Sequence, residues 1–259
     1  MPALLEVEGL GIGFGGVQAV QGVSLSLEAG EILALIGPNG AGKTTVFNCI
    51  SGIYRAQAGD IRLGGRSLLG LPPHRVAAAG LARTFQNIEL FHHLSTMDNL
   101  LLGRHRFMRS GVLGGMALFG PRSPAAREEM QHREKVEEII DFLELQAVRS
   151  KPVGSLPYGT RKIVELGRAL AMEPQVLLLD EPAAGMNLEE KQDLRLWIED
   201  IVARFGVAVL LIEHDMPFVG DLADRVIALN HGVKIAEGSP EAVRTHPEVL
   251  RAYLGADAA

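Results

Sequence analysis

The sequence predicts an α/β fold built on an open, mostly parallel β-sheet. Apolar runs of strand length lie at 176–179, 207–212 and 225–229 and contain no polar residue apart from Arg225 at the start of the third, which is typical of strands buried on both faces. Helix-favouring segments at 188–204 and 217–223 lie between them, and such alternation indicates this fold class. Ligands are therefore expected at the carboxyl ends of the strands.

Composition and charge bear on the domain size, the kind of partner and the redox compartment of the protein. A chain of 259 residues is long enough for one large α/β domain. The net charge of −6 argues against nucleic acid as the main partner. Cys49 is the only cysteine, which excludes an internal disulfide, indicates a reducing compartment and suits a small core position on a helix.

Two features bear on membranes. The N-terminus lacks a basic start and a long apolar run, so no signal peptide is expected. The longest apolar stretch outside the expected strands, 111–120, is shorter than the ~20 residues of a spanning helix. The chain itself is therefore not expected to cross a membrane.

A glycine-rich loop is the strongest motif. It follows an expected strand at 31–36 and precedes an expected helix at 43–51. It matches G-x-x-x-x-G-K-[ST], in which backbone N–H groups surround phosphates, the lysine reaches the outer phosphates and the hydroxyl ligates Mg²⁺. A chance glycine turn is the alternative, which the flanking pattern disfavours. The predicted nucleotide-binding residues are Gly37, Pro38, Asn39, Gly40, Ala41, Gly42, Lys43, Thr44 and Thr45.

An acidic pair follows the apolar run at 176–179. Asp180 can hold the shell of a Mg²⁺ ion that Thr44 also ligates, and Glu181 can act as general base on the attacking water. Two solvated acids at a strand end would explain the pair by itself. Together with the glycine loop, the pair predicts a phosphate-loop NTPase that uses ATP and Mg²⁺.

Other segments complete the expected organisation. Residues 87–155 show no strong strand, and 124–145 has apolar residues at helical spacing. We therefore expect one domain over 1–259, with an α/β core at 1–86 and 156–259 and a helical insertion at 87–155. The remaining expected strands lie at 4–10, 24–27 and 60–63, the first two separated by a glycine-rich turn at 13–16.

The order of motifs along the chain resembles that of the ABC ATPases over nearly the full length. The motifs are Phe14, the glycine loop, Gln86 in RTFQ, LPYGT at 156–160, Asp180-Glu181, AGMN at 184–187 and His214. Within that family the chain is most similar to the LivG-type ATPases of branched-chain amino-acid importers, through VFNC at 46–49, DEPAAGMN at 180–187, IEHDM at 212–216 and RAYLG at 251–255. The resemblance implies an N-terminal antiparallel β part beside the parallel sheet and an inserted helical subdomain.

The resemblance also implies roles for single residues. Phe14 would stack on adenine, although a packed loop aromatic is an equal alternative. Gln86 would complete the metal and water shell, so it is both a catalytic and a metal residue, and would link ATP to the helical insertion. His214 would contact the terminal phosphate and hold the attacking water with Glu181. An ordinary polar residue and a structural histidine are the respective alternatives.

The segment 156–160 occupies the place of the family's LSGGQ signature. Tyr158 and Gly159 would face the ATP of a second subunit, at the N-terminus of the helix that follows. Pro157 replaces the usual serine and removes a hydroxyl and an N–H, so a weaker contact is expected. The alternative is that 156–160 only begins the following helix and contacts no nucleotide. Asn187 would lie near the dimer seam.

As a whole, the resemblance implies an ATPase subunit that energises branched-chain amino-acid uptake. Its partners would be transmembrane permease subunits, a second ABC ATPase (a homodimer or a LivF-like heterodimer) and, indirectly, a periplasmic binding protein. It would lie at the cytoplasmic face of the inner membrane as a peripheral protein. Urea or amide uptake, a soluble ABC ATPase without a permease, and a nucleotide sensor remain alternatives. The apolar stretch 111–119 would pack against the core or dock a partner.

Overall fold

The computed structural model describes residues 3–108 and 124–256. The apolar stretch 111–119, expected to pack or to dock, lies outside the described residues. The chain divides into two compact units, one made of the residues up to Gln86 and from Pro174 onward, the other of Asn87–Glu173. No helix in the described ranges is both long enough and apolar enough to span a bilayer.

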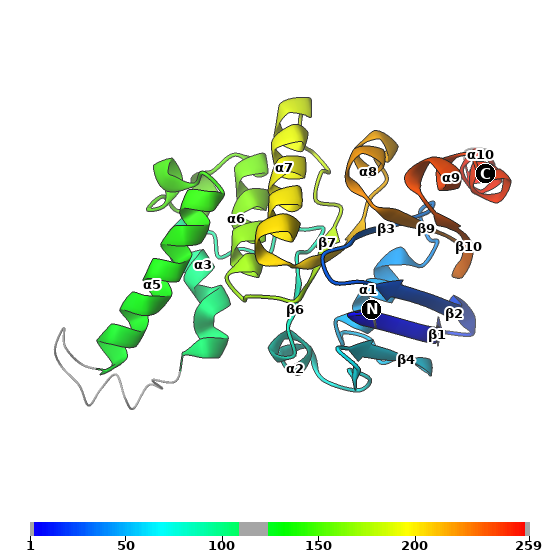
Figure 1. Ribbon diagram of the computed structural model, residues 1–259, viewed down its shortest axis with the longest axis horizontal. Helices are drawn as coiled ribbons and strands as arrows, with labels where there is room; N and C mark the ends of the chain where they lie inside the picture. Colours follow the sequence, from blue (N-terminus) through cyan, green and yellow to red (C-terminus); the bar gives the residue numbers. More distant parts are fainter. Residues whose placement is uncertain (1–2, 109–123, 257–259) are drawn as a thin grey trace. The chain divides into compact units, whose positions relative to one another are not determined.

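A six-stranded sheet lies at the centre of the first unit, with the order β10-β9-β3-β8-β7-β6 (Figure 1). Its members are β3 (Ile32–Ile36), β6 (Leu81–Arg83), β7 (Val176–Asp180), β8 (Ala208–Ile212), β9 (Arg225–Asn230) and β10 (Val233–Gly238). All neighbouring pairs are parallel except β9 with β10. Every residue of β3, β7 and β8 is buried, which confirms the sheet that the unbroken apolar runs predict.

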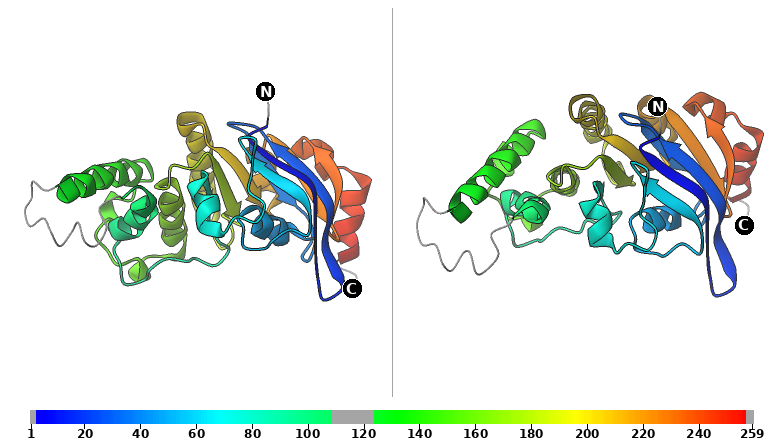
Figure 2. Two further views of the ribbon diagram at one scale, coloured as in Figure 1. Left: turned by 90° about the horizontal axis from the view of Figure 1, so that it is seen from below. Right: turned by 60° about the horizontal axis from the view of Figure 1, so that its bottom comes forward.

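The N-terminal part forms a four-stranded antiparallel sheet in the order β2-β1-β4-β5. Its strands are β1 (Leu5–Phe14), β2 (Val17–Leu27), β4 (Ala58–Leu63) and β5 (Arg66–Ser67). The first two strands are longer than expected and form one long hairpin, visible in Figure 2. Register shifts near Leu10 and Ile12 interrupt the alternation of buried and exposed side chains, which is why the sequence pattern ends early.

Six helices accompany the strands of the first unit, and the last two of them form the C-terminal part of the described chain. In the first unit they are α1 (Lys43–Ile50), α2 (Pro73–Ala78), α7 (Leu188–Phe205), α8 (Met216–Leu222), α9 (Pro240–Arg244) and α10 (Pro247–Ala256). A capping box at Asn187 and Glu190 begins α7, because each side chain accepts the backbone N–H of the other residue. α7 therefore begins at Leu188, where the sequence places it.

The second unit is helical. It contains α3 (Thr96–Arg104), α5 (Pro124–Phe142), α6 (Tyr158–Leu170) and 3₁₀ turns at His105–Phe107, Gln146–Val148 and Val153–Ser155. Three of the apolar residues at helical spacing, Val136, Ile140 and Leu143, are fully or almost fully buried, and Ile139 is half-buried. The helical periodicity in 124–145 therefore marks the buried face of α5 and the turn that follows it.

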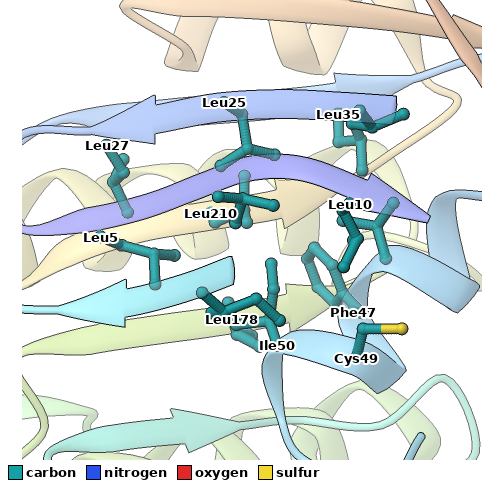
Figure 3. Close-up of a cluster of buried hydrophobic side chains, with 14 of the residues drawn as sticks. Leu5, Leu10, Leu25, Leu27, Leu35, Phe47, Cys49, Ile50, Leu178 and Leu210 are labelled. Atoms are coloured by element: carbon teal, nitrogen blue, oxygen red, sulfur yellow. The ribbon is translucent and has the colours of Figure 1, made fainter. Parts of the chain in front are cut away.

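The main core of the first unit lies between the two sheets and includes α1. Phe47, Cys49 and Ile50 of α1 meet leucines from both sheets, as Figure 3 shows. Cys49 is 4% exposed, which confirms its expected core position. Because the core packs directly against α1, it holds the helix that begins at Lys43 and so supports the loop before it.

Shortening a core side chain is expected to destabilise this unit strongly. Phe47 is fully buried, and Phe47→Ala should lower the free energy of unfolding by about 3–5 kcal/mol, because the cavity adds to the lost burial. Phe205→Ala, at a side chain that is 55% exposed, is the matched control and should change it by about 0.5 kcal/mol or less. Urea unfolding followed by circular dichroism measures both, and equal losses would contradict the expectation.

Candidate functional site

The glycine-rich loop connects the end of β3 to the start of α1, where the sequence predicts a phosphate site. Two of its glycines are required by close approach. A Cβ at Gly37 would lie 2.2 Å from the Leu229 carbonyl oxygen, and one at Gly42 would lie 2.6 Å from the Ala19 carbonyl oxygen. Both also have positive φ angles, 148° and 99°. At these two positions the loop therefore takes a shape that only glycine can adopt without strain.

The Lys43 side chain folds back onto the glycine-rich loop that precedes it. It is 8% exposed, and its Nζ donates to the carbonyl oxygens of Gly37 (2.6 Å) and Pro38 (3.0 Å). Burial lowers the pKa of Lys43, while the nearby carboxylates of Asp180 and Glu181 act in the opposite direction. The structure thus places the lysine of the loop beside both acids that the sequence singles out.

The neighbouring loop residues differ in accessibility. Thr44 is exposed and Thr45 half-buried at the start of α1, while Asn39 and Gly40 are exposed at the tip of the loop. Ala41 is buried, and Pro38 is half-buried. The open face of the loop therefore presents backbone and the Thr44 hydroxyl, as a phosphate and metal site requires.

Asp180 and Glu181 stand at the carboxyl end of β7. Asp180 is 3% exposed, and burial raises the pKa of its carboxyl, which Arg83 opposes. Glu181 has a left-handed backbone (φ 49°), unusual for a residue with a side chain. Its Oε2 accepts a hydrogen bond from Nε2 of Gln86 at 3.0 Å. The structure therefore brings together three of the predicted site residues within one unit.

Arg83 is a site residue for which the sequence alone indicates no role. Its guanidinium donates to Asp180 Oδ2 (2.8 Å), Asn48 Oδ1 (2.7 Å) and Ser51 Oγ (3.0 Å). It also lies over the ring of Phe85, 5.0 Å from the centroid. The only sequence signal is its place in the RTFQ motif, three residues before Gln86. Arg83 ties the acidic end of β7 to α1.

Removing this guanidinium should be much more destabilising than removing an exposed one. Arg83→Met leaves Asp180 buried without its partner and should lower the free energy of unfolding by about 3–5 kcal/mol. Arg62→Met is the control: Arg62 pairs with Glu8 and Asp60 at 40% exposure, and such pairs contribute about 0–1 kcal/mol. Chemical denaturation measures the difference, and a loss at Arg83 no larger than at Arg62 would contradict it.

His214 and Phe14 are more exposed than Lys43 and Asp180. His214 follows β8, the strand next to β7, and its side chain is 62% exposed. Phe14 ends β1, is 47% exposed, and packs edge-on against Tyr54 with ring centroids 5.2 Å apart. An exposed ring braced by a second aromatic residue offers a flat apolar face. Tyr54 is not among the site residues predicted from the sequence, but its ring supports that of Phe14.

The segment 156–160 lies in the second unit, at the start of α6. Pro157 is the N-cap residue, α6 begins at Tyr158, and Gly159 is buried. The Tyr158 ring is 41% exposed, with the Lys162 ammonium and the Arg161 guanidinium 5.6 Å and 5.7 Å from its centroid. The start of α6 thus offers the backbone N–H groups of a helix N-terminus, which suit an anion, while both cations lie against the Tyr158 ring.

The residues near Lys43 fit a magnesium ion by their chemistry. Thr44 supplies a hydroxyl oxygen, Asp180 a carboxylate and Gln86 an amide oxygen, and Mg²⁺ prefers such hard oxygen ligands. A neighbouring phosphate would complete the coordination, since Mg²⁺ sites often use one or two carboxylates with phosphate oxygens.

A glycine-rich loop of the phosphate-binding type follows β3, and an acidic pair ends β7, two strands away in the same sheet. Together with an antiparallel sheet and a separate helical unit, these features define an ATPase of the ABC type. Comparison with known proteins agrees: residues 20–184 match the ABC transporter family, and 233–259 match a family described as branched-chain amino acid ATP-binding cassette transporter. The chain belongs to the ABC transporter family of ATP-hydrolysing subunits.

Individual relatives cover nearly the whole chain. The sequence is 42% identical to the high-affinity branched-chain amino acid transport ATP-binding protein BraF of Pseudomonas aeruginosa, over 97% of this chain and 98% of that protein. It is 39% identical to the corresponding LivG of Escherichia coli, with the same coverage. The ADP conformation of MJ1267, an ATP-binding cassette of an ABC transporter, superposes with a TM-score of 0.85 at 30% identity, over 98% of this chain and 100% of that one.

Proposed function

We propose that this chain hydrolyses ATP to energise the uptake of branched-chain amino acids through separate permease subunits. The likeness to BraF and LivG over nearly the whole chain carries the proposal, because both are named as high-affinity branched-chain amino acid transport proteins. The separate match of 233–259 to a branched-chain amino acid family supports it from a part of the chain outside the general ABC match.

The chemistry belongs to the residues gathered near the carboxyl ends of β3 and β7. The loop amides and Lys43 bind the phosphates, and Thr44, Asp180 and Gln86 supply the oxygens that hold Mg²⁺. When bound, Mg²⁺ would neutralise part of the negative charge on the phosphates. Glu181 accepts the proton of the attacking water, His214 contacts the terminal phosphate, and Phe14 with Tyr54 supports the adenine.

A second ATPase subunit completes the site. Tyr158 and Gly159 of one subunit face the nucleotide bound by the loop of the other, and Asn187 lies near the seam. The partner is a second copy of this chain or a LivF-like sister. ATP binding favours the closed pair and phosphate release favours the open one, because the nucleotide contacts both subunits only when the pair is closed.

The second unit transmits the opening and closing of the ATPase pair to the permease in the membrane. Gln86, which donates to Glu181, is the residue that directly precedes this unit in the chain. A change at the terminal phosphate therefore acts on the start of the helical segment that contacts the permease. The subunit works as a peripheral protein at the cytoplasmic face of the membrane, with a periplasmic binding protein delivering the cargo to the permease.

Uptake by the complete transporter tests the proposal. The chain is expressed together with its cognate permease and binding-protein subunits in cells that lack branched-chain amino-acid uptake, and entry of labelled leucine is measured. We expect saturable leucine uptake that Lys43→Ala abolishes. Labelled urea is the comparator. Uptake of urea without leucine, or leucine uptake unaffected by Lys43→Ala, would overturn the proposal.

A further inference from the structure

A buried carboxylate, Glu213, lies directly after β8, between the two loops proposed to activate water. Its side chain is 1% exposed, although glutamate is seldom fully buried. Among the described residues no lysine or arginine forms an ion pair with it. The His214 ring lies near it, with Nδ1 3.9 Å from Glu213 Oε2 and most of the ring in solvent. Burial raises the pKa of Glu213.

Backbone amides stabilise this carboxylate. Its Oε1 accepts the N–H of Ala183 at 2.8 Å, and its Oε2 accepts the N–H of His214 at 3.1 Å. The first bond crosses from β8 to the turn after β7, and the second holds the start of the loop that carries His214. A single side chain therefore connects two segments that lie thirty positions apart in the sequence.

The turn that Glu213 holds is the turn that carries Glu181. At its start, Glu181 N–H donates to the Ile212 carbonyl oxygen (2.9 Å), and within it Ala184 N–H donates to the Glu181 carbonyl oxygen (3.3 Å). The left-handed backbone of Glu181 is costly for a residue with a Cβ and persists only where the surroundings enforce it. The bond from Ala183 to Glu213 anchors the end of this turn.

Packing alone gives a poor account of a carboxylate here. A buried charge without a cationic partner is expensive, and an apolar residue of similar size would fill the same space without that penalty. We propose that Glu213 is a positioning residue: through its hydrogen bonds to the backbone N–H groups of Ala183 and His214 it fixes the Glu181 turn and the His214 loop in the geometry that hydrolysis requires. This inference rests on the ATPase activity described above.

Glu213→Gln tests the proposal with little change in shape. A glutamine has one acceptor oxygen, so its NH₂ group must face one of the two N–H donors. We expect kcat for MgATP to fall about tenfold to a hundredfold, while the Kd for a fluorescent ATP analogue changes by less than about threefold. Glu213→Asp, which keeps both acceptor oxygens on a shorter arm, should lose less activity.

Glu31→Gln is the matched control. Glu31 is also largely buried and also accepts a backbone N–H, from Glu28 at 2.7 Å, and it pairs with Arg225. It precedes β3, at the opposite end of the sheet from Glu213. Its substitution should lower thermal stability and leave kcat unchanged. A kcat loss in Glu31→Gln equal to that in Glu213→Gln would show a general effect of weakening the core and would overturn the proposal.

Amide hydrogen exchange gives a readout independent of turnover. In Glu213→Gln the amides of 181–186 and 213–216 should exchange faster than in the unsubstituted protein, while those of α7 should not. Unchanged exchange in both segments, or full kcat in folded Glu213→Gln, would overturn the positioning role. Absence of ATPase activity in the unsubstituted protein would instead count against the proposed function, and the exchange result would still decide the role of Glu213.

Discussion

Glu181→Gln is expected to retain nucleotide binding and to lose nearly all ATP turnover. The substitution keeps the size of the side chain and an acceptor for the Gln86 amide, but it removes the carboxylate that would take a proton from water. General-base groups contribute about 10²- to 10⁴-fold to rate, so kcat should fall by that factor. Steady-state phosphate release measures kcat, and equilibrium titration with a fluorescent ATP analogue measures the Kd.

Glu189→Gln provides the control for this substitution. Glu189 is an exposed acid in the first turn of α7, eight positions further along the chain, and neutralising it removes one nearby negative charge without touching the end of β7. Its kcat should match that of the unsubstituted protein. Normal turnover in Glu181→Gln would remove Glu181 from the role of base, and loss of nucleotide binding would show that it acts in the ground state as well.

Lys43→Ala is expected to weaken nucleotide binding itself. The ammonium sits at the carbonyl oxygens of Gly37 and Pro38, within the loop that would surround the phosphates. Hydrogen bonds to charged groups are worth about 1.5–3 kcal/mol, so the Kd for ATP should rise about 10- to 100-fold, with turnover falling further. Titration with MgATP by calorimetry measures the affinity.

Lys234→Ala separates this effect from the loss of any lysine. Lys234 also donates to a main-chain carbonyl, that of Ser24 at 3.0 Å, but it lies on β10 and pairs with Glu237. Its removal should leave the Kd unchanged. If Lys43→Ala bound MgATP as tightly as Lys234→Ala does, the loop before α1 would not be the phosphate site.

Much of the fold follows from hydrophobic pattern. The central strands are predictable because they are buried on both faces, so each is an unbroken apolar run, as in β7 and β8. β6 escapes detection because three residues are too few for a periodic signal. β10 escapes it because an antiparallel edge strand is half-exposed and mixes lysine and glutamate with its apolar residues.

The candidate site divides in a similar way. The glycine loop and the acidic pair are local in sequence, so their spacing alone points to phosphate and metal. Arg83 and Glu213 are different: each matters because folding buries it against a segment far away in the chain, Asp180 for Arg83 and Ala183 for Glu213. Neither burial nor such long-range partners can be inferred from the neighbours of a residue in the sequence.

The single cysteine makes this protein a convenient starting point for site-directed labelling. Burial raises the pKa of the Cys49 thiol to about 11, and the thiolate is the form that reacts with maleimides. The folded protein should therefore remain unmodified at neutral pH with its native cysteine in place. A probe attached to one cysteine introduced at an exposed position such as Val17, which is 71% exposed, would then report the separation of the two subunits in the proposed ATPase pair.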